Sequence, residues 1–318
     1  MAYGRVAFVT GGAGDICSAQ TRALVYLGAN ACIIGRNAEK TETVARDIAK
    51  VRKGAKVIGI GNVDVRNFDN LKAAADRCAA ELGGIDFVIA GAAGNFVAPI
   101  AGLSPNAFKT VLDIDTIGTF NTVKATVDYL VESASKYPGA SAAGADPNAI
   151  SGGKFIAVSA TFHYTGLPMQ AHVSAAKAAV DSIVASVALE YGPRGVMANV
   201  IAPGPIEGTE GMSRLSSTDH VADQASKSAR QPGTRGGSPS IPSGRWGSVR
   251  DISDATVYLF SATGDNVNGH VLVVDGGAWR RQGSAISVGL DPGMEYPNFL
   301  LAGEMSTKLK GGKSKSKL

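Results

Sequence analysis

The chain has 318 residues and few charged ones (18%), as suits a tightly packed α/β protein. Its formal net charge is +4, but five lysines fall in Lys308–Leu318, so the near-neutral body lacks the basic footprint of a nucleic-acid-binding protein. We expect no membrane span, because no apolar run reaches roughly 18 residues, and no secretory segment before Val6. The three cysteines, Cys17, Cys32 and Cys78, are widely spaced. Their spacing predicts reduced thiols in an intracellular compartment and not a metal site.

The first segment with a clear pattern runs from Arg5 to Arg36. An apolar run, Val6–Val9, leads into the glycine-rich stretch Thr10–Gly14, and a helical pattern and a second apolar run, Ala31–Ile34, follow. Strand, glycine turn, helix and strand form the first half of a dinucleotide-binding unit. The glycines let the backbone approach a pyrophosphate, and the helix N-terminus offers free N–H groups. A glycine cluster alone is a weak sign of a nucleotide site. Here it follows a strand and precedes a helix at the start of an α/β pattern, which strengthens the prediction.

Helical and strand patterns alternate through the rest of the body. We expect further helices at Glu39–Lys53, Phe68–Leu82, Pro105–Tyr137, His172–Tyr191 and Arg250–Phe260. Further strands are expected at Lys56–Ile60, Ile85–Ala90, Lys154–Ser159, Val196–Ile201 and Val271–Val274. This alternation predicts an α/β fold of Rossmann type, a doubly wound parallel sheet with helices on both faces. We expect a single domain over residues 1–280, in which 203–244 is rich in Gly, Ser and Pro, and a flexible C-terminal extension at 281–318.

The end of the second strand indicates which nicotinamide cofactor the site takes. In dinucleotide-binding folds, an acidic residue at this place holds the ribose 2′-OH of NAD. This chain has Arg36 there, and a guanidinium suits contact with a phosphate. We therefore expect NADP(H) in preference to NAD(H). The simpler alternative is a solvated surface arginine, which is common at strand ends.

Motifs spread over Arg5–Trp279 point to one family. They are Thr10-Gly11-Gly12, Asp64, Ala90–Gly94, Lys177 within Ser174–Ala178, Pro203-Gly204 with Thr209, and Val274–Gly277. Together they resemble the short-chain dehydrogenase/reductase family. Within that family the chain looks most similar to the peroxisomal 2,4-dienoyl-CoA reductases, and the stretches that carry this similarity are Gly12–Gly14, Ala92–Phe96, Asp113–Thr116, Ser159–Tyr164 and Gly208–Gly211.

The resemblance implies a set of NADP(H)-binding residues near the ends of the strands. They are Gly11, Gly12, Gly14, Asp15, Ile16, Arg36, Asp64, Val65, Gly91, Lys177, Pro203, Gly204 and Ile206. The chain departs from the family pattern at Asp15 and Cys17, where the family has glycines. The remaining glycines must then supply the close approach. Asp15 can cap the start of the helix, but it repels a phosphate if it points inward.

A larger departure concerns the proton donor. The family's usual tyrosine acid lies four residues before the lysine, and that position is Val173. A hydroxyl-to-carbonyl proton transfer of the ordinary kind has no donor there. Either the site is inactive, or it runs a different reaction.

The similarity to the dienoyl-CoA reductases accounts for the missing tyrosine. The resemblance implies hydride addition from NADPH to the far carbon of a conjugated dienoyl thioester, followed by protonation of the dienolate next to the thioester carbonyl. Such an intermediate needs stabilisation of negative charge on the thioester oxygen and a proton source, which can be a water. The resemblance implies Asp115 as the general acid or the organiser of that water, and Lys177 as the group that holds the nicotinamide ribose.

Other polar residues are further candidates. Tyr164, 13 residues before Lys177, is an alternative phenolic donor, with packing or substrate lining as its other reading. Ser159 can bond the thioester oxygen, although serines at strand ends are often simply turn residues. His172 fits capping or packing better than a role as base. The expected contacts with the acyl-CoA substrate are Asn95, Phe96, Thr116 and Gly211; for Phe96 the alternative is a place in the core.

The chain ends in Ser316-Lys317-Leu318, the tripeptide that the peroxisomal import receptor reads. It follows a tail rich in lysine, serine and glycine, so we expect a peroxisomal protein; a disordered basic tail without an address is the alternative. The resemblance also implies a homo-oligomer, either a dimer or a tetramer, in line with the common closed symmetry of soluble proteins.

Three functions are open from the sequence. The first is NADPH-dependent reduction of 2,4-dienoyl-CoA to 3-enoyl-CoA in peroxisomal β-oxidation of unsaturated fatty acids. A reductase acting on a polyene or polyketide thioester in a specialised biosynthetic pathway is its variant. The second is a carbonyl reductase of the same fold, which Val173 disfavours. The third is a nucleotide-binding protein without catalysis, favoured only if Asp115 and Lys177 are dispensable.

Overall fold

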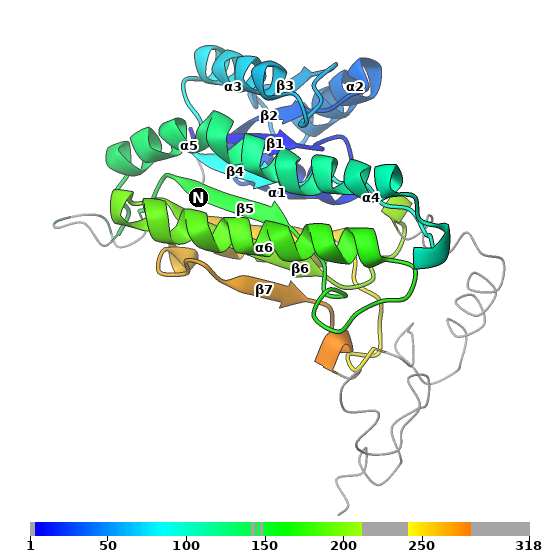
Figure 1. Cartoon of the computed structure of the whole chain (residues 1–318). Coiled ribbons are helices and arrows are strands. Elements are labelled where there is room, and N and C mark those ends of the chain that lie inside the picture. The colour runs from blue at the N-terminus through cyan, green and yellow to red at the C-terminus, as the bar shows by residue number, and fades with distance from the viewer. Residues whose placement is uncertain (1–3, 141–143, 145, 147–148, 212–240, 281–318) are drawn as a thin grey trace, which may run out of the picture.

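The computed structural model describes residues 4–140, 144, 146, 149–211 and 241–280. A seven-stranded parallel sheet of order β3-β2-β1-β4-β5-β6-β7 forms its centre (Figure 1). The strands are β1 Val6–Thr10, β2 Asn30–Ile34, β3 Val57–Ile60, β4 Phe87–Ala90, β5 Lys154–Val158, β6 Met197–Pro203 and β7 Val271–Val274. The strand order reverses between β1 and β4, and such a switch point puts ligand sites at the carboxyl ends of the strands. The predicted doubly wound parallel sheet is confirmed.

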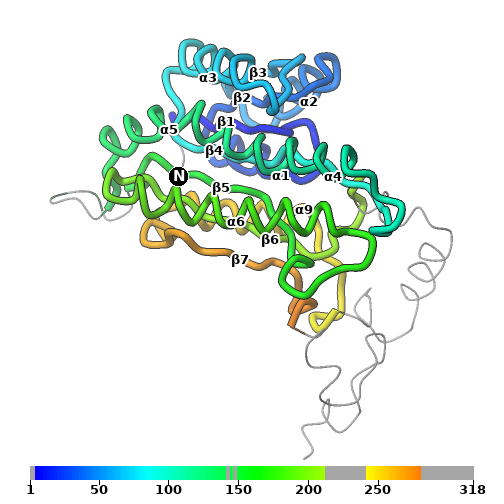
Figure 2. Tube along the Cα trace, in the orientation of Figure 1, coloured from blue at the N-terminus to red at the C-terminus, as the bar shows by residue number. Residues whose placement is uncertain are grey.

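Helices cover both faces of the sheet. The α-helices are α1 Asp15–Tyr26, α2 Ala38–Ala49, α3 Phe68–Leu82, α4 Pro105–Leu112, α5 Gly118–Lys136, α6 Ala171–Tyr191 and α9 Val249–Phe260. Short 3-10 turns are η1 Ile100–Gly102, η3 Gly192–Arg194 and η4 Ala262–Gly264. Helices α3, α5 and α6 share one apolar cluster, and α1, α2 and α9 share the other (Figures 1 and 2).

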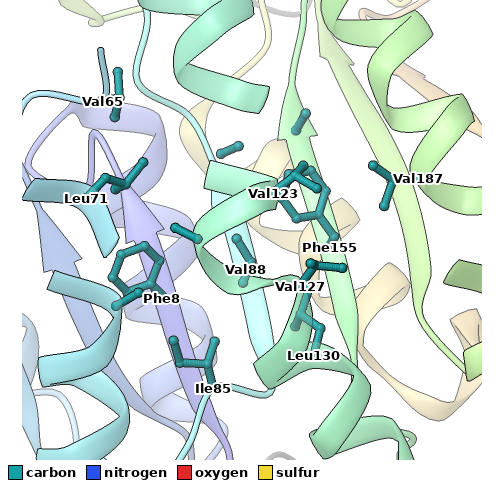
Figure 3. Close-up of a cluster of buried hydrophobic side chains, with 14 of the residues drawn as sticks. Phe8, Val65, Leu71, Ile85, Val88, Val123, Val127, Leu130, Phe155 and Val187 are labelled. Atoms are coloured by element: carbon teal, nitrogen blue, oxygen red, sulfur yellow. The ribbon is translucent and has the colours of Figure 1, made fainter. Parts of the chain in front are cut away.

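Alternation along the strands divides the core between these two layers. In β1, Phe8 faces the α3, α5 and α6 layer, whereas Ala7 and Val9 face the opposite one, because successive side chains of a strand point to opposite faces. Figure 3 shows Phe8, Val88 and Phe155 in the first cluster. Side chains therefore pack on both faces of the sheet, and this packing fixes the positions of the carboxyl ends of its strands.

The helix expected over Pro105–Tyr137 is divided in the structure. A π-helical turn, Asp113–Ile117, separates α4 from α5. Gly118 follows this turn, and a Cβ there would lie 2.5 Å from Cγ2 of Val65, so only glycine lets α5 begin this close to the segment after β3. Single π turns within helices frequently occur at functional sites.

Helix α6 and the turn after it, Ala171–Arg194, are long and apolar enough by length and composition to cross a membrane, with a mean hydropathy of 1.3. The sequence predicted a helix over His172–Tyr191 and no membrane span. Its apolar side chains Val180, Val184 and Val187 belong to the core cluster on the sheet. The buried face of this helix is thus part of the core, and 44% of the apolar window is buried.

A buried ion pair lies at the amino end of β5. Lys154 is 1% exposed, and its Nζ donates to the carbonyl oxygen of Ser261 at 2.7 Å and pairs with Asp265. Burial lowers the pKa of Lys154, and the pairing with Asp265 opposes that shift. The Asp265 side chain is itself only 18% exposed, so each charge depends on the other for compensation.

We expect Lys154→Met to lower the free energy of unfolding by about 3 kcal/mol, because it leaves the Asp265 carboxylate partly buried without its cation. Urea denaturation would measure the change. The matched control is Lys50→Met, which removes a lysine paired with Asp47 on an exposed helix surface; there we expect a loss below about 0.5 kcal/mol. Equal losses in the two variants would contradict the structural importance of the buried pair.

Candidate active site

A cavity of about 840 Å³ opens at the carboxyl ends of the strands. Its wall comes from the turn after β1, the end of β2, the segments after β3, β4 and β5, the π turn, α6 and the turn after β6. The sequence-predicted residues that line it are Gly11, Gly14, Asp15, Ile16, Arg36, Asp64, Val65, Gly91, Asn95, Asp115, Ser159, Lys177 and Gly211. The fold thus brings cofactor and substrate candidates from distant segments into one space.

Asp115 and Lys177 form the ionic centre of this cavity. The π turn carries Asp115, which is 1% exposed, and its Oδ1 accepts a hydrogen bond from the backbone N–H of Gly94 at 2.7 Å. Its Oδ2 lies 3.0 Å from Lys177 Nζ. The same Nζ donates to the carbonyl oxygen of Val158, at the end of β5, at 3.0 Å. The carboxylate and the ammonium are therefore held in a fixed relation at the cavity wall.

The position of the missing tyrosine is apolar. Val173 is 3% exposed, lines the cavity, and belongs to a small cluster with Val111 and Ala176. A hydroxyl is available nearby, because Ser159 also lines the cavity and its buried Oγ has no hydrogen-bond partner among the described residues. A buried hydroxyl without a protein partner is suited to donating to a ligand oxygen.

Tyr164 is not among the residues that line the cavity. Its hydroxyl donates to Oδ2 of Asp181 at 2.7 Å, and Nε2 of His163 lies 2.7 Å from the same oxygen. Burial, together with this bond, raises the pKa of Tyr164. The structure does not bring this phenol to the site, and the bond to a carboxylate makes it a poor acid.

Other sequence candidates also lie outside the cavity lining: Gly12, Phe96, Thr116, Pro203, Gly204 and Ile206. A Cβ at Gly12 would lie 2.5 Å from Cβ of Ile33, and one at Gly204 would lie 2.5 Å from Cβ of Asp275, so both glycines permit close packing. Phe96 is partly buried, and its ring stacks on His172 with ring centroids 4.2 Å apart. Thr116 donates to the carbonyl oxygen of Ala176 at 3.3 Å.

Arg36 shares its end of the cavity with a second cation that the sequence reading missed. Lys40 also lines the cavity, one helical turn further along the chain. Asn37, between them, caps α2 by accepting a hydrogen bond from the backbone N–H of Lys40 at 2.9 Å. Asp64 lines this end too, but it is paired with Arg66, whose hydrogen bond lowers the Asp64 pKa. Arg36 and Lys40 together suit an anionic group such as a phosphate.

The start of α1 differs from the expectation for Asp15. Gly14 is the N-cap residue and makes no side-chain capping bond, and Asp15 is the first helical residue. Its Oδ2 accepts a hydrogen bond from the backbone N–H of Glu210 at 2.8 Å. The prediction that Asp15 caps the helix is wrong, because its side chain reaches the turn after β6 instead.

Cys17 occupies the second position where the family has glycine, and it lines the cavity. Burial raises the pKa of its thiol to about 12, and the nearby charge of Lys177 opposes that shift. A Cβ on Gly91 would lie 2.1 Å from Sγ of Cys17. The thiol therefore fills space that Gly91 leaves open. Like Cys32 and Cys78, Cys17 is free and buried.

The lining residues fit a nicotinamide dinucleotide. The turn after β1 leads into a helix start without a side-chain cap, where N–H groups suit a pyrophosphate. Two cations lie at one end, and the charged pair with the free hydroxyl of Ser159 lies in another part of the same cavity.

Comparison with known proteins agrees with this geometry. A family model described as enoyl-(acyl carrier protein) reductase matches residues 11–278. A peroxisomal 2,4-dienoyl-CoA reductase of Saccharomyces cerevisiae is 47% identical over 277 residues, covering 87% of this chain and 84% of that protein. The chain belongs to the short-chain dehydrogenase/reductase family. A peroxisomal 2,4-dienoyl-CoA reductase of Danio rerio is 38% identical over 275 residues, covering 86% of this chain and 81% of that protein.

Several solved structures share the fold of this chain. A gluconate 5-dehydrogenase from Burkholderia cenocepacia, crystallised with NADP and tartrate, is 28% identical with a TM-score of 0.70, covering 87% of this chain and 95% of that one. Levodione reductase has a TM-score of 0.74 at 21% identity, covering 88% of this chain and 99% of that one. At that identity the likeness concerns the fold alone.

We expect Gly91→Ala to lower the free energy of unfolding by about 1–3 kcal/mol, because the new Cβ overlaps Sγ of Cys17. Adding Cys17→Ala should restore most of the loss, since it removes the overlapping atom. Chemical denaturation of the single and double variants would measure both effects. Gly102→Ala is the control: its nearest neighbour, Cγ of Pro99, would lie at an ordinary 3.6 Å. A double variant no more stable than Gly91→Ala would contradict the overlap.

Proposed function

We propose that this chain is an NADPH-dependent 2,4-dienoyl-CoA reductase that forms 3-enoyl-CoA in peroxisomal β-oxidation of unsaturated fatty acids. The observation that carries the proposal is the buried Asp115–Lys177 pair beside the unpartnered hydroxyl of Ser159, in a cavity where Val173 takes the place of a tyrosine acid. Such a site suits stabilisation of a dienolate better than protonation of an alkoxide. The activities for which the relatives in yeast and zebrafish are named support the same reaction.

Cofactor binding follows from the charges and free N–H groups of the cavity. The turn at Gly11 and Gly14 and the start of α1 hold the pyrophosphate, and Arg36 with Lys40 holds the 2′-phosphate of NADP(H). Lys177 bonds the nicotinamide ribose. When bound, the cofactor supplies a hydride for the far carbon of the dienoyl group. The preference for NADP(H) rests on the two cations and on Arg36 in the place of an acidic residue.

Side chains of the protein stabilise the negative charge on the thioester oxygen and supply or direct the proton that is added next to the carbonyl. The Ser159 hydroxyl donates a hydrogen bond to the thioester oxygen, and the positive charge of Lys177 favours the anion that develops there. Asp115 either orients a water that gives the proton to the carbon next to the carbonyl, or first takes up a proton from solvent and then gives that proton itself. Its bond from the Gly94 N–H keeps one carboxylate oxygen occupied, so the other, near Lys177, is the oxygen that can bind a proton or a water.

The proposed function also assigns roles to the segment after β6 and to the C-terminal end of the chain. From the family resemblance we propose residues 203–244 as the substrate lid; residues 212–240 lie outside the described residues. Ser316-Lys317-Leu318 lie outside the described residues, and with the peroxisomal relatives they support import by the peroxisomal receptor. We also propose the division at residue 280 between reductase domain and tail, acyl-CoA as the substrate, and a homo-oligomer without nucleic-acid partners.

The reaction is tested by mixing purified protein, NADPH and 2,4-hexadienoyl-CoA. We expect the dienoyl absorbance to fall as NADPH is consumed, with a 3-enoyl product. Asp115→Asn should lower kcat by about 10²–10⁴-fold, because it removes the acid or the organiser of the water. NADPH binding, followed by fluorescence, should persist in this variant.

Asp113→Asn is the matched control, since it changes a carboxylate on the same π turn that pairs with Lys109 and does not line the cavity. Its kcat should equal that of the wild type. Full turnover by Asp115→Asn would contradict the assignment of Asp115 as the acid or the organiser of the water. NADPH binding by the wild type without turnover of the dienoyl-CoA would favour another conjugated thioester or a non-catalytic role.

Cofactor preference is tested at Arg36. We expect Arg36→Ala to raise the KM for NADPH by about tenfold or more, because it removes a charge-assisted hydrogen bond to the 2′-phosphate. The KM for NADH should change little, since NADH has no such phosphate. Arg46→Ala, on the exposed surface of α2, is the control and should leave both constants unchanged. Equal changes for the two cofactors would argue against a 2′-phosphate contact.

A further inference from the structure

Asp15 is an unusual residue at the start of a helix that faces a cofactor. It is the first residue of α1, it lines the cavity, and the N-cap Gly14 contributes no side-chain bond. The first N–H groups of such a helix attract anions. A carboxylate therefore stands beside the groups that suit a pyrophosphate.

The carboxylate also connects two segments far apart in the chain. Its Oδ2 accepts the hydrogen bond from the Glu210 N–H at 2.8 Å. Thr209, Glu210 and Gly211 all line the cavity, and the Thr209 hydroxyl donates to the carbonyl oxygen of Ile206 at 2.9 Å, which closes the turn after β6. The hydrogen bond that Glu210 N–H donates to Asp15 thus connects this turn to α1 at the cavity wall.

The charge and the oxygen of Asp15 have different consequences. A pyrophosphate at the start of α1 is repelled by a carboxylate within a few ångströms, and this repulsion weakens binding severalfold. The oxygen, by contrast, needs no charge to accept a bond from the Glu210 N–H. An asparagine at this position keeps an acceptor oxygen without the charge, whereas an alanine removes both.

We propose that Asp15 is a positioning residue with two separable effects. Its oxygen holds residues 209–211 in place at the cavity wall for the acyl-CoA substrate. Its charge weakens the binding of NADP(H). The inference rests on the proposed function, because it takes a dinucleotide as the ligand of this cavity.

The test compares Asp15→Asn and Asp15→Ala in the full chain. We expect both variants to lower the Kd for NADPH by about fivefold, measured by fluorescence titration, because both remove the negative charge. Only Asp15→Ala should raise the KM for 2,4-hexadienoyl-CoA, by about fivefold, because it alone loses the bond to Glu210. The control is Asp69→Asn, which removes an exposed carboxylate from the first turn of α3, away from the cavity, and should change neither constant.

A wild-type Kd for NADPH in Asp15→Asn would overturn the charge effect. Equal KM values for the acyl-CoA in Asp15→Asn and Asp15→Ala would overturn the positioning effect. Either result, obtained with a wild-type protein that binds NADPH and reduces the dienoyl-CoA, leaves the proposed function standing. A wild-type protein that binds no NADPH would instead remove the proposed function and this inference together.

Discussion

The buried pair of Asp115 and Lys177 constrains the site more than any other contact. A charge buried without its partner costs several kcal/mol, so the elements that carry these two groups must stay in register. The second oxygen of Asp115 bonds the Gly94 N–H after β4, and Lys177 Nζ also bonds the end of β5. One ion pair therefore joins the π turn, α6 and the segments after two neighbouring strands. The cavity has its shape because these four parts meet there.

The fold was predictable because its signals are local and repeat along the chain. Apolar runs such as Val6–Val9 become strands covered on both faces, and the glycine stretch after the first of them marks the turn into a helix. The π turn was not predictable from periodicity, because α4, the turn and α5 together have the pattern of one long helix. The close approach of Gly118, just after this turn, to Val65 is likewise a contact between segments that the sequence does not show to be neighbours.

The residues of the site could be predicted where a sequence motif marks them. They were harder to predict where tertiary packing determines which side chains reach the cavity. Asp115, Ser159 and Lys177 came from motifs, and the structure brings them to one cavity. Tyr164 has a suitable spacing from Lys177, but Asp181, one helical turn beyond that lysine, binds its hydroxyl. Lys40 has the sequence surroundings of an ordinary surface lysine. Its place beside Arg36 appears only when α2 is set against the end of β2.

The two departures from the family's glycine pattern show why one substituted position is a poor guide to whether a binding site is retained. Cys17 has a side chain where the family has none, and Gly91 leaves the space that the thiol fills, since a Cβ there would lie 2.1 Å from Sγ. A small residue at the end of β4 thus compensates for a larger one on α1. Asp15 is accommodated differently, because its carboxylate finds the Glu210 N–H. A larger residue in the place of a family glycine therefore does not indicate a lost site where a neighbouring segment offers space or a hydrogen-bond donor for it.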